Sequence, residues 1–204
     1  MPQPALLTAG ALAALLSGWL AVRLAEMPQG QRRILRGAFV LAPAAVAAAL
    51  LLAGLDALLA LAIACALPFG VGAVALDWRE GAIADGHSTG LAVTGLLAAP
   101  VLHPYATWTL ALGGAALAAG ILLFGDVLVR LRTRKPGLGT GDYGLAAAGG
   151  LWCGLGWVGP ALLAAIAVTL VLALAGGREL RGKLAFAPGL VAGFAMATIA
   201  GRLV

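Results

Sequence analysis

Apolar residues along this chain form long stretches that are interrupted only by short polar segments. A membrane-spanning helix needs about 20 mostly apolar residues, and somewhat fewer where it is short or buried by neighbours. By this rule the sequence predicts eight helices, at residues 5–22, 37–54, 57–76, 88–103, 106–128, 143–158, 160–176 and 184–203. The sixth and seventh are short and are separated only by a turn at 156–160, so one joined helix, and seven in total, is the alternative. The pattern is that of an all-α, polytopic transmembrane helix bundle.

The composition agrees with a membrane protein and excludes a soluble domain. Hydrophobic residues make up 62% of the 204 residues and charged residues only 10%, with a mean hydropathy of +1.04, whereas soluble domains are about half apolar. Every polar interval is shorter than about 20 residues, and a compact domain needs at least about 50. We therefore treat residues 1–204 as a single transmembrane domain. No basic residue precedes the first apolar stretch, so we interpret it as a retained helix and not as a cleaved signal.

Basic residues gather in alternate loops, which predicts the orientation in the membrane. Lys and Arg mark cytoplasmic loops and also contact anionic lipid headgroups. We therefore expect both termini on the non-cytoplasmic side of the cell inner membrane, with membrane lipids as partners and no nucleic acid. Apart from Arg202, the basic residues are Arg23, Arg32, Arg33 and Arg36 in the first loop, Arg79 in the third, Arg130, Arg132, Arg134 and Lys135 in the fifth, and Arg178, Arg181 and Lys183 in the seventh.

Two aspartates lie where apolar segments meet loops on the same predicted side. Asp77 ends the third predicted helix and Asp142 precedes the sixth. Carboxylates are costly near hydrocarbon, so a pair at one depth suggests chemistry. Two close carboxylates cannot both ionise, which supplies the base and the acid that peptide hydrolysis requires. Gly139 and Gly141 can adopt backbone conformations closed to other residues and can let another helix or a substrate approach Asp142.

The residues around both aspartates resemble the motifs of a known family. Asp77 is followed after five residues by Ile83-Ala84-Asp85, which is similar to the first aspartate motif of the type IV prepilin peptidases. Gly139-Thr140-Gly141-Asp142-Tyr143-Gly144-Leu145 is similar to their second motif, Gly-x-Gly-Asp-x-Lys-Leu. The resemblance extends to the basic run 130–135 and to Phe186-Ala187-Pro188-Gly189, and covers about residues 57–204.

The resemblance implies a membrane aspartyl endopeptidase that removes the basic leader from prepilins or pseudopilins at the cytoplasmic face. Asp77 and Asp142 would be the catalytic pair and would titrate as a unit. Gly139, Gly141 and Asp85 would support the motifs, and no cofactor is implied. This protein would serve type IV pilus assembly or protein secretion.

The chain departs from the family pattern at three places. Ala84 replaces the Pro of the first motif, and Gly144 replaces the Lys of the second, which removes a cation near Asp142. The loop 23–36 contains no cysteine, whereas bifunctional members carry a cysteine-bearing region there, so we expect no methyltransferase activity.

Other polar residues have simpler interpretations. We expect Asp126 to form an i, i+4 ion pair with Arg130, with a support role near the catalytic pair as the alternative. Asp142 could cap the sixth helix as well as catalyse. No set of side chains has metal-ligand spacing, so we expect no metal site. The remaining expectations are that Arg79, Glu80 and His87 face water, that His103 lies in a loop on the opposite side, and that Cys65 and Cys153 are small core residues.

Two other functions remain open at the level of the sequence. A proton-coupled transporter or channel could use Asp77, Asp126 and Asp142 as a relay, and would require carboxylates stacked through the membrane or an inverted repeat. A catalytically silent relative could bind pilins without cleaving them, as the Ala84 and Gly144 departures suggest.

Overall fold

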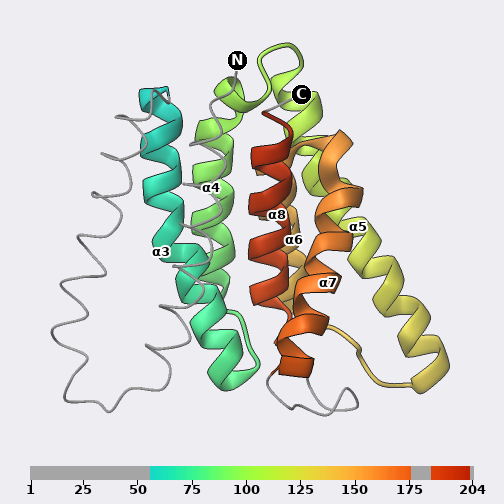
Figure 1. The fold of residues 1–204 in the computed structure, drawn as a ribbon. Helices are drawn as coiled ribbons and strands as arrows, with labels where there is room; N and C mark the ends of the chain where they lie inside the picture. Colours follow the sequence, from blue (N-terminus) through green and yellow to red (C-terminus); the bar gives the residue numbers. More distant parts are fainter. Residues whose placement is uncertain (1–55, 176–184, 203–204) are drawn as a thin grey trace, which may run out of the picture.

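The computed structural model describes residues 56–175 and 185–202, which form a bundle of α-helices without strands in these ranges (Figure 1). All six predicted helices that fall in these ranges are present, while the predicted helices at 5–22 and 37–54 lie outside them, so a total of eight stays a prediction. The helices are α3 (Ala57–Glu80), α4 (Asp85–Leu102), α5 (Thr107–Thr133), α6 (Thr140–Cys153), α7 (Val158–Ala175) and α8 (Ala187–Ala200), with a short 3-10 helix η2 (Leu155–Trp157) before α7.

Successive helices run in opposite directions, so the bundle has two chemically different ends (Figure 1). One end is formed by the C-termini of α3, α5 and α7 and by the N-termini of α4, α6 and α8. We call it the motif end, because both aspartate motifs lie there. His103 and the turn between α6 and α7 lie at the opposite end, as predicted for His103.

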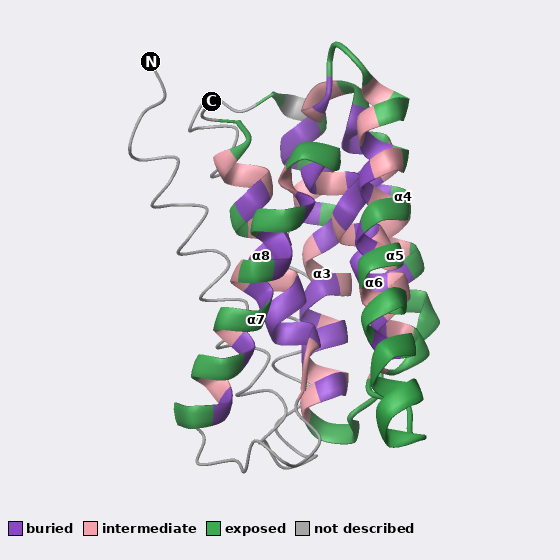
Figure 2. Cartoon of the chain, turned by 90° about the vertical axis from the view of Figure 1, so that its right-hand side faces the viewer, coloured by how far each residue is buried: buried purple, intermediate pink, exposed green. Residues whose placement is uncertain are grey.

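Helix lengths and burial divide the bundle into an outer and an inner part. Among the described residues, three helical segments are long and apolar enough to cross a membrane: Leu58–Glu80, Thr107–Thr133 and Leu155–Ala175. By contrast, α6 and α8 have 14 residues each, about 21 Å of helix against a hydrocarbon core of about 30 Å. Helix α6 packs against α4, α5 and α8 and is largely buried, whereas α5 exposes most of its surface (Figure 2). The second aspartate motif therefore opens an inner helix.

Small residues allow pairs of helices in the bundle to approach closely. A Cβ atom on Gly114 of α5 would lie 2.3 Å from the carbonyl oxygen of Gly150 on α6. The pairing of α7 with α8 is similar, because a Cβ on Gly193 would lie 2.3 Å from the carbonyl oxygen of Ala161. Backbone contact at this distance leaves no room for any side chain.

The structure separates the sixth and seventh predicted helices and moves the turn between them. The turn begins at Gly154, which has a positive φ of 73°, and continues through η2, so it begins before the predicted turn at 156–160 and overlaps its first residues. Glycine is suited to this conformation. The buried His103 ring lies against Gly154 and its Nε2 is 3.2 Å from the carbonyl oxygen of Leu151. The alternative of one joined helix is therefore wrong.

The two cysteines differ in environment. Cys153 is a buried core residue, as predicted, but Cys65 is exposed on α3, so its assignment to the core is wrong. Apolarity identifies a residue that avoids water, and in a membrane-spanning helix the outer surface satisfies that preference as well as the core does.

Candidate active site

Asp77 lies in the last turn of α3, where its side chain is only 7% exposed. The backbone amide of Ala187, the first residue of α8, donates a hydrogen bond of 2.8 Å to Asp77 Oδ2. Helix α3 ends at Gly81, which has a φ of 63° and whose amide donates to the Asp77 carbonyl oxygen at 2.9 Å. The first four amides of a helix lack hydrogen-bond acceptors within that helix. The Asp77 carboxylate supplies an acceptor for the first amide of α8.

Asp142 occupies the third position of α6 and is 9% exposed. Its Oδ2 accepts a hydrogen bond of 2.9 Å from the amide of Gly139, the N-cap residue. Asp142 therefore caps α6, as predicted. Its side chain does so from the third helical position and not from the N-cap position. A carboxylate in the first turn is stabilised by the positive end of the helix dipole.

The surroundings of Asp142 oppose its ionisation. Asp142 precedes the predicted apolar span 143–158 and lies outside the three segments long enough to cross the membrane. Burial raises the pKa of Asp142 to about 6, the negative charge of Asp77 acts in the same direction, and the Gly139 amide opposes both. Asp77, the other predicted catalytic residue, is therefore close enough for its charge to act on Asp142.

Packing explains how the two aspartates come to one end of the bundle. Ala73, one turn before Asp77, and Leu145, one turn after Asp142, belong to the same buried cluster as Ala187. Ile83 packs against this cluster from the loop between α3 and α4. Three helices and one loop thus converge around the two carboxylates.

The two motif glycines have different roles. A Cβ on Gly141 would lie 2.7 Å from the Ile83 Cβ and 2.8 Å from its carbonyl oxygen, so Gly141 permits the close approach of the 81–84 loop. A Cβ on Gly139 would meet only Asp142 Oδ2, at an ordinary 3.5 Å. Neither glycine has a positive φ. Among the described glycines, a positive φ occurs at Gly81 and Gly154. The prediction of unusual backbone conformations at both positions is wrong. A close approach occurs at Gly141, but the segment that approaches is the 81–84 loop and not a helix.

The other motif residues lie at the same end. Asp85 is exposed at the first position of α4, and Arg79 and Glu80 are exposed as predicted. A Cβ on Gly144 would come within 3.2 Å of the Ser88 Cβ, so the missing side chain of the second motif lets α4 pack closely on α6.

His87 does not face water as predicted. It is half-buried, its ring covers Gly72 of α3, and its Nδ1 is buried without a hydrogen-bond partner in the described part of the chain.

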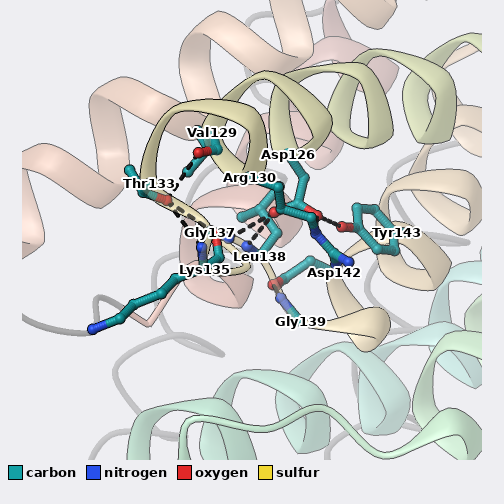
Figure 3. Close-up of polar contacts among 10 residues, drawn as sticks. All are labelled: Asp126, Val129, Arg130, Thr133, Lys135, Gly137, Leu138, Gly139, Asp142 and Tyr143. Atoms are coloured by element: carbon teal, nitrogen blue, oxygen red, sulfur yellow. Dashed lines mark hydrogen bonds and ion pairs between the residues drawn. The ribbon is translucent and has the colours of Figure 1, made fainter.

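Asp126 forms the predicted ion pair with Arg130, and it also bonds to the loop that leads to Asp142 (Figure 3). The sequence pattern on α5 identified the pair but not the contacts beyond it. Ala187 was also missed as a site residue, although the Phe186–Gly189 segment belongs to the resemblance; a backbone amide gives no signal in the sequence.

The arrangement provides two buried carboxyl groups and no metal cluster. Within residues 56–175 and 185–202, no group of three or more His, Cys, Asp or Glu side chains could hold a metal ion. One carboxyl group with a raised pKa beside a second one is the arrangement that general acid and base catalysis by a pair requires.

Comparison with known proteins assigns the family. The sequence profile of the type IV leader peptidase family matches residues 65–174, which are 110 of the 204 residues and include both aspartate motifs. No curated protein and no solved structure matches the chain at a significant level. The chain, a helical protein with apolar spans and two buried motif aspartates, belongs to the type IV leader peptidase family.

Proposed function

We propose that this protein is an aspartic-type endopeptidase that cleaves the basic leader from prepilin-like or pseudopilin substrates at the cytoplasmic face of the inner membrane. One observation carries the proposal: two buried aspartates from the two family motifs lie at one end of the bundle, each bonded to an amide at a helix N-terminus. Burial of a carboxylate is costly, so two at one place indicate a functional requirement.

The environments of the two aspartates support different roles. We assign Asp77 as the base, because the N-terminal amide of α8 stabilises a carboxylate, and Asp142 as the acid, because burial raises its pKa to about 6. Asp77 takes a proton from water, and the hydroxide attacks the carbonyl carbon while Asp142 hydrogen-bonds the carbonyl oxygen. Asp77 then passes this proton to the amide nitrogen, and the C–N bond breaks to give a carboxylic acid and an amine. The acid loses its proton, so a carboxylate and a protonated amine leave, and both aspartates return to their starting states.

The charge at the motif end supports its orientation toward the cytoplasm. The basic residues there face away from the core, whereas Arg202 is the one basic residue described at the opposite end. Basic residues favour the cytoplasmic side. A substrate whose apolar helix lies in the bilayer would then present the junction with its leader at the depth of the two aspartates. The basic residues in question are Arg79, Arg130, Arg132, Arg134 and Lys135.

The positions of the buried acids disfavour the transporter alternative. Within the described ranges, Asp77, Asp126 and Asp142 are all at the motif end, whereas a relay needs groups spread through the membrane thickness. Only a measurement of activity distinguishes a peptidase from a catalytically silent relative that binds pilins.

Co-expression with candidate prepilins tests the proposal. We expect the wild-type protein to shorten a prepilin, seen as a mobility shift, and Asp77→Asn or Asp142→Asn to abolish the shift. Asp56→Asn is the matched control, because this exposed aspartate caps α3 at the opposite end. Cleavage that survives loss of either motif aspartate would reject the mechanism, and binding without cleavage by the wild type would indicate the silent relative.

A further inference from the structure

Among the described residues, Asp126 is the least exposed charged residue of the motif end. It lies on α5, one turn before Arg130, and is 1% exposed. An ion pair on the surface of a helix needs no such burial, because water solvates both partners. The burial of Asp126 therefore requires a further explanation.

Four donors surround the Asp126 carboxylate (Figure 3). Oδ1 accepts from the amides of Gly137, at 2.6 Å, and Leu138, at 3.1 Å. Oδ2 accepts from Arg130 Nε and from the Tyr143 hydroxyl, the latter at 2.6 Å. Charge-assisted hydrogen bonds are about twice as strong as neutral ones, so this set offsets the cost of burial and ties three segments together.

The partners of Asp126 flank Asp142 on both sides. Leu138 precedes Gly139, whose amide donates to Asp142 Oδ2, and Tyr143 follows Asp142 directly. The loop of residues 134–139 is mostly exposed, so its packing alone holds it weakly. The bonds to Asp126 thus place the amide that contacts the proposed acid.

We propose that Asp126 is a positioning residue, which orients the Asp142 carboxylate by holding the 134–139 loop and the Tyr143 ring. This inference rests on the proposed peptidase function, but its central contacts can be measured without activity. Asp126 itself touches no reacting atom and acts through Gly139 and Tyr143.

Loss of the Asp126 contacts changes Asp142 in a defined direction. The hydrogen bond from the Gly139 amide lowers the pKa of Asp142. Release of the loop weakens this bond and therefore raises the pKa of Asp142. Among the described residues, the charge of Asp77 on α3 acts on Asp142, and Arg134 and Lys135 lie on the loop itself. Arg130 of α5 pairs with Asp126, so removal of Asp126 alone would leave the Arg130 charge without its partner. The test variant must therefore remove both charges.

The test compares the charge-balanced variant Asp126→Leu/Arg130→Gln, in which residue 126 has no oxygen to accept from the Gly137 and Leu138 amides, with Arg130→Gln alone. Misplacement of a catalytic group costs on the order of 10- to 100-fold in rate, so we expect the double variant to lower kcat to this extent with little change in KM. The alkaline limb of its pH–rate profile should move upward by about one pH unit, the equivalent of one lost charge-assisted bond. Arg130→Gln alone keeps the bonds from Gly137, Leu138 and Tyr143. It should therefore have a smaller effect on kcat and on the alkaline limb of the pH–rate profile.

Asp56→Leu serves as the matched control. Asp56 Oδ1 also accepts from two backbone amides, those of Leu58 and Leu59, but at the opposite end of the bundle. This variant should keep the wild-type kcat and pH profile. A folded double variant with wild-type kcat and pH profile overturns the proposal. If the double variant does not fold, Tyr143→Phe removes one bond only, and an unchanged kcat in that variant overturns the proposal instead.

Two measurements separate this inference from the proposed function. Hydrogen exchange of the Gly137, Leu138 and Gly139 amides in detergent should be slow in the wild type and faster in the double variant. The titration of the protonated-carboxyl infrared band that Asp142→Asn removes should shift to higher pH. If the wild type cleaves no prepilin, the proposed function fails, and these two measurements still decide: unchanged exchange or an unchanged Asp142 titration overturns the positioning role.

Discussion

The carboxylate of Asp77 accepts a hydrogen bond of 2.8 Å from the amide of Ala187, a residue 110 positions further along the chain. This bond joins the end of α3 to the start of α8, and its donor, Ala187, lies beyond the residues 65–174 that match the family profile. The last described helix is therefore part of the site, and its first amide is a partner of the proposed base.

Removal of the Ala187 amide should impair catalysis more than folding. Ala187→Pro eliminates the N–H at the first helical position, where proline fits the helix itself. Because Phe186 has αR backbone angles, which a following proline disfavours, some loss of stability should accompany the variant. A hydrogen bond to a charged group contributes about 1.5–3 kcal/mol, so we expect kcat/KM to fall on the order of 10- to 100-fold. Ala187→Gly is the matched control, because it keeps the N–H and removes only the buried methyl group. Equal losses in the two variants would assign the effect to packing.

The two motif glycines should differ in their tolerance of a methyl group. Gly141→Ala places a Cβ 2.7 Å from the Ile83 Cβ, so the 81–84 loop must move, at a cost of about 1–3 kcal/mol in the free energy of unfolding. Gly139→Ala makes only an ordinary contact and should cost less than about 1 kcal/mol. Thermal unfolding in detergent measures both, and a larger loss for Gly139→Ala would contradict the assigned roles.

The close approach of α5 and α6 should depend on Gly114. In Gly114→Ala the new Cβ would lie 2.3 Å from the Gly150 carbonyl oxygen, so the helices must separate and stability should fall by at least about 1–3 kcal/mol. Gly125 lies on the same helix with open space at its Cβ position. Gly125→Ala should be neutral or stabilise by up to about 1 kcal/mol through helix propensity. Similar melting temperatures for the two variants would argue against this packing.

Ionisation of Asp142 should reduce stability as pH rises. The pKa of Asp142 is raised to about 6 in the folded protein by burial, above the ordinary value of about 3.9. The folded state therefore holds this proton more tightly, and the cost of ionisation is absent below pH 4 and complete above pH 6. Asp142→Asn carries no charge, so its advantage over the wild type should grow between these limits, by about 1–3 kcal/mol at most. A constant difference in melting temperature across this range would refute the assignment.

Peptidase activity should fall as pH rises through about 6. The mechanism requires a proton on one member of the pair, and the Asp142 proton is lost in this range, at a pKa of about 6. The alkaline limb of the pH–rate profile should therefore lie there, and it belongs to the interacting pair and not to Asp142 alone. Initial rates on a prepilin substrate in detergent would measure it, and activity that keeps rising above pH 8 would contradict the role of Asp142 as acid.

The patterns of apolar and charged residues predicted much of this protein. The six helices in the described ranges, the placement of both motif aspartates at one end and the Asp126–Arg130 pair all followed from the sequence. These features depend on local properties: transfer of a side chain out of water depends mainly on that side chain, and i, i+4 neighbours meet on any helix. The errors occurred where the environment of a side chain matters, as for the exposed Cys65 and the half-buried His87.

The contacts that build the site required the packed bundle. The bond from Ala187 to Asp77, the approach of Ile83 to Gly141 and the loop held by Asp126 each join segments that are separate in the sequence. All three contacts involve backbone atoms, which every residue carries and which no pattern of side chains distinguishes. They form because helices of fixed length and small-residue faces can pack in few ways, and that selection takes place among the helices in space.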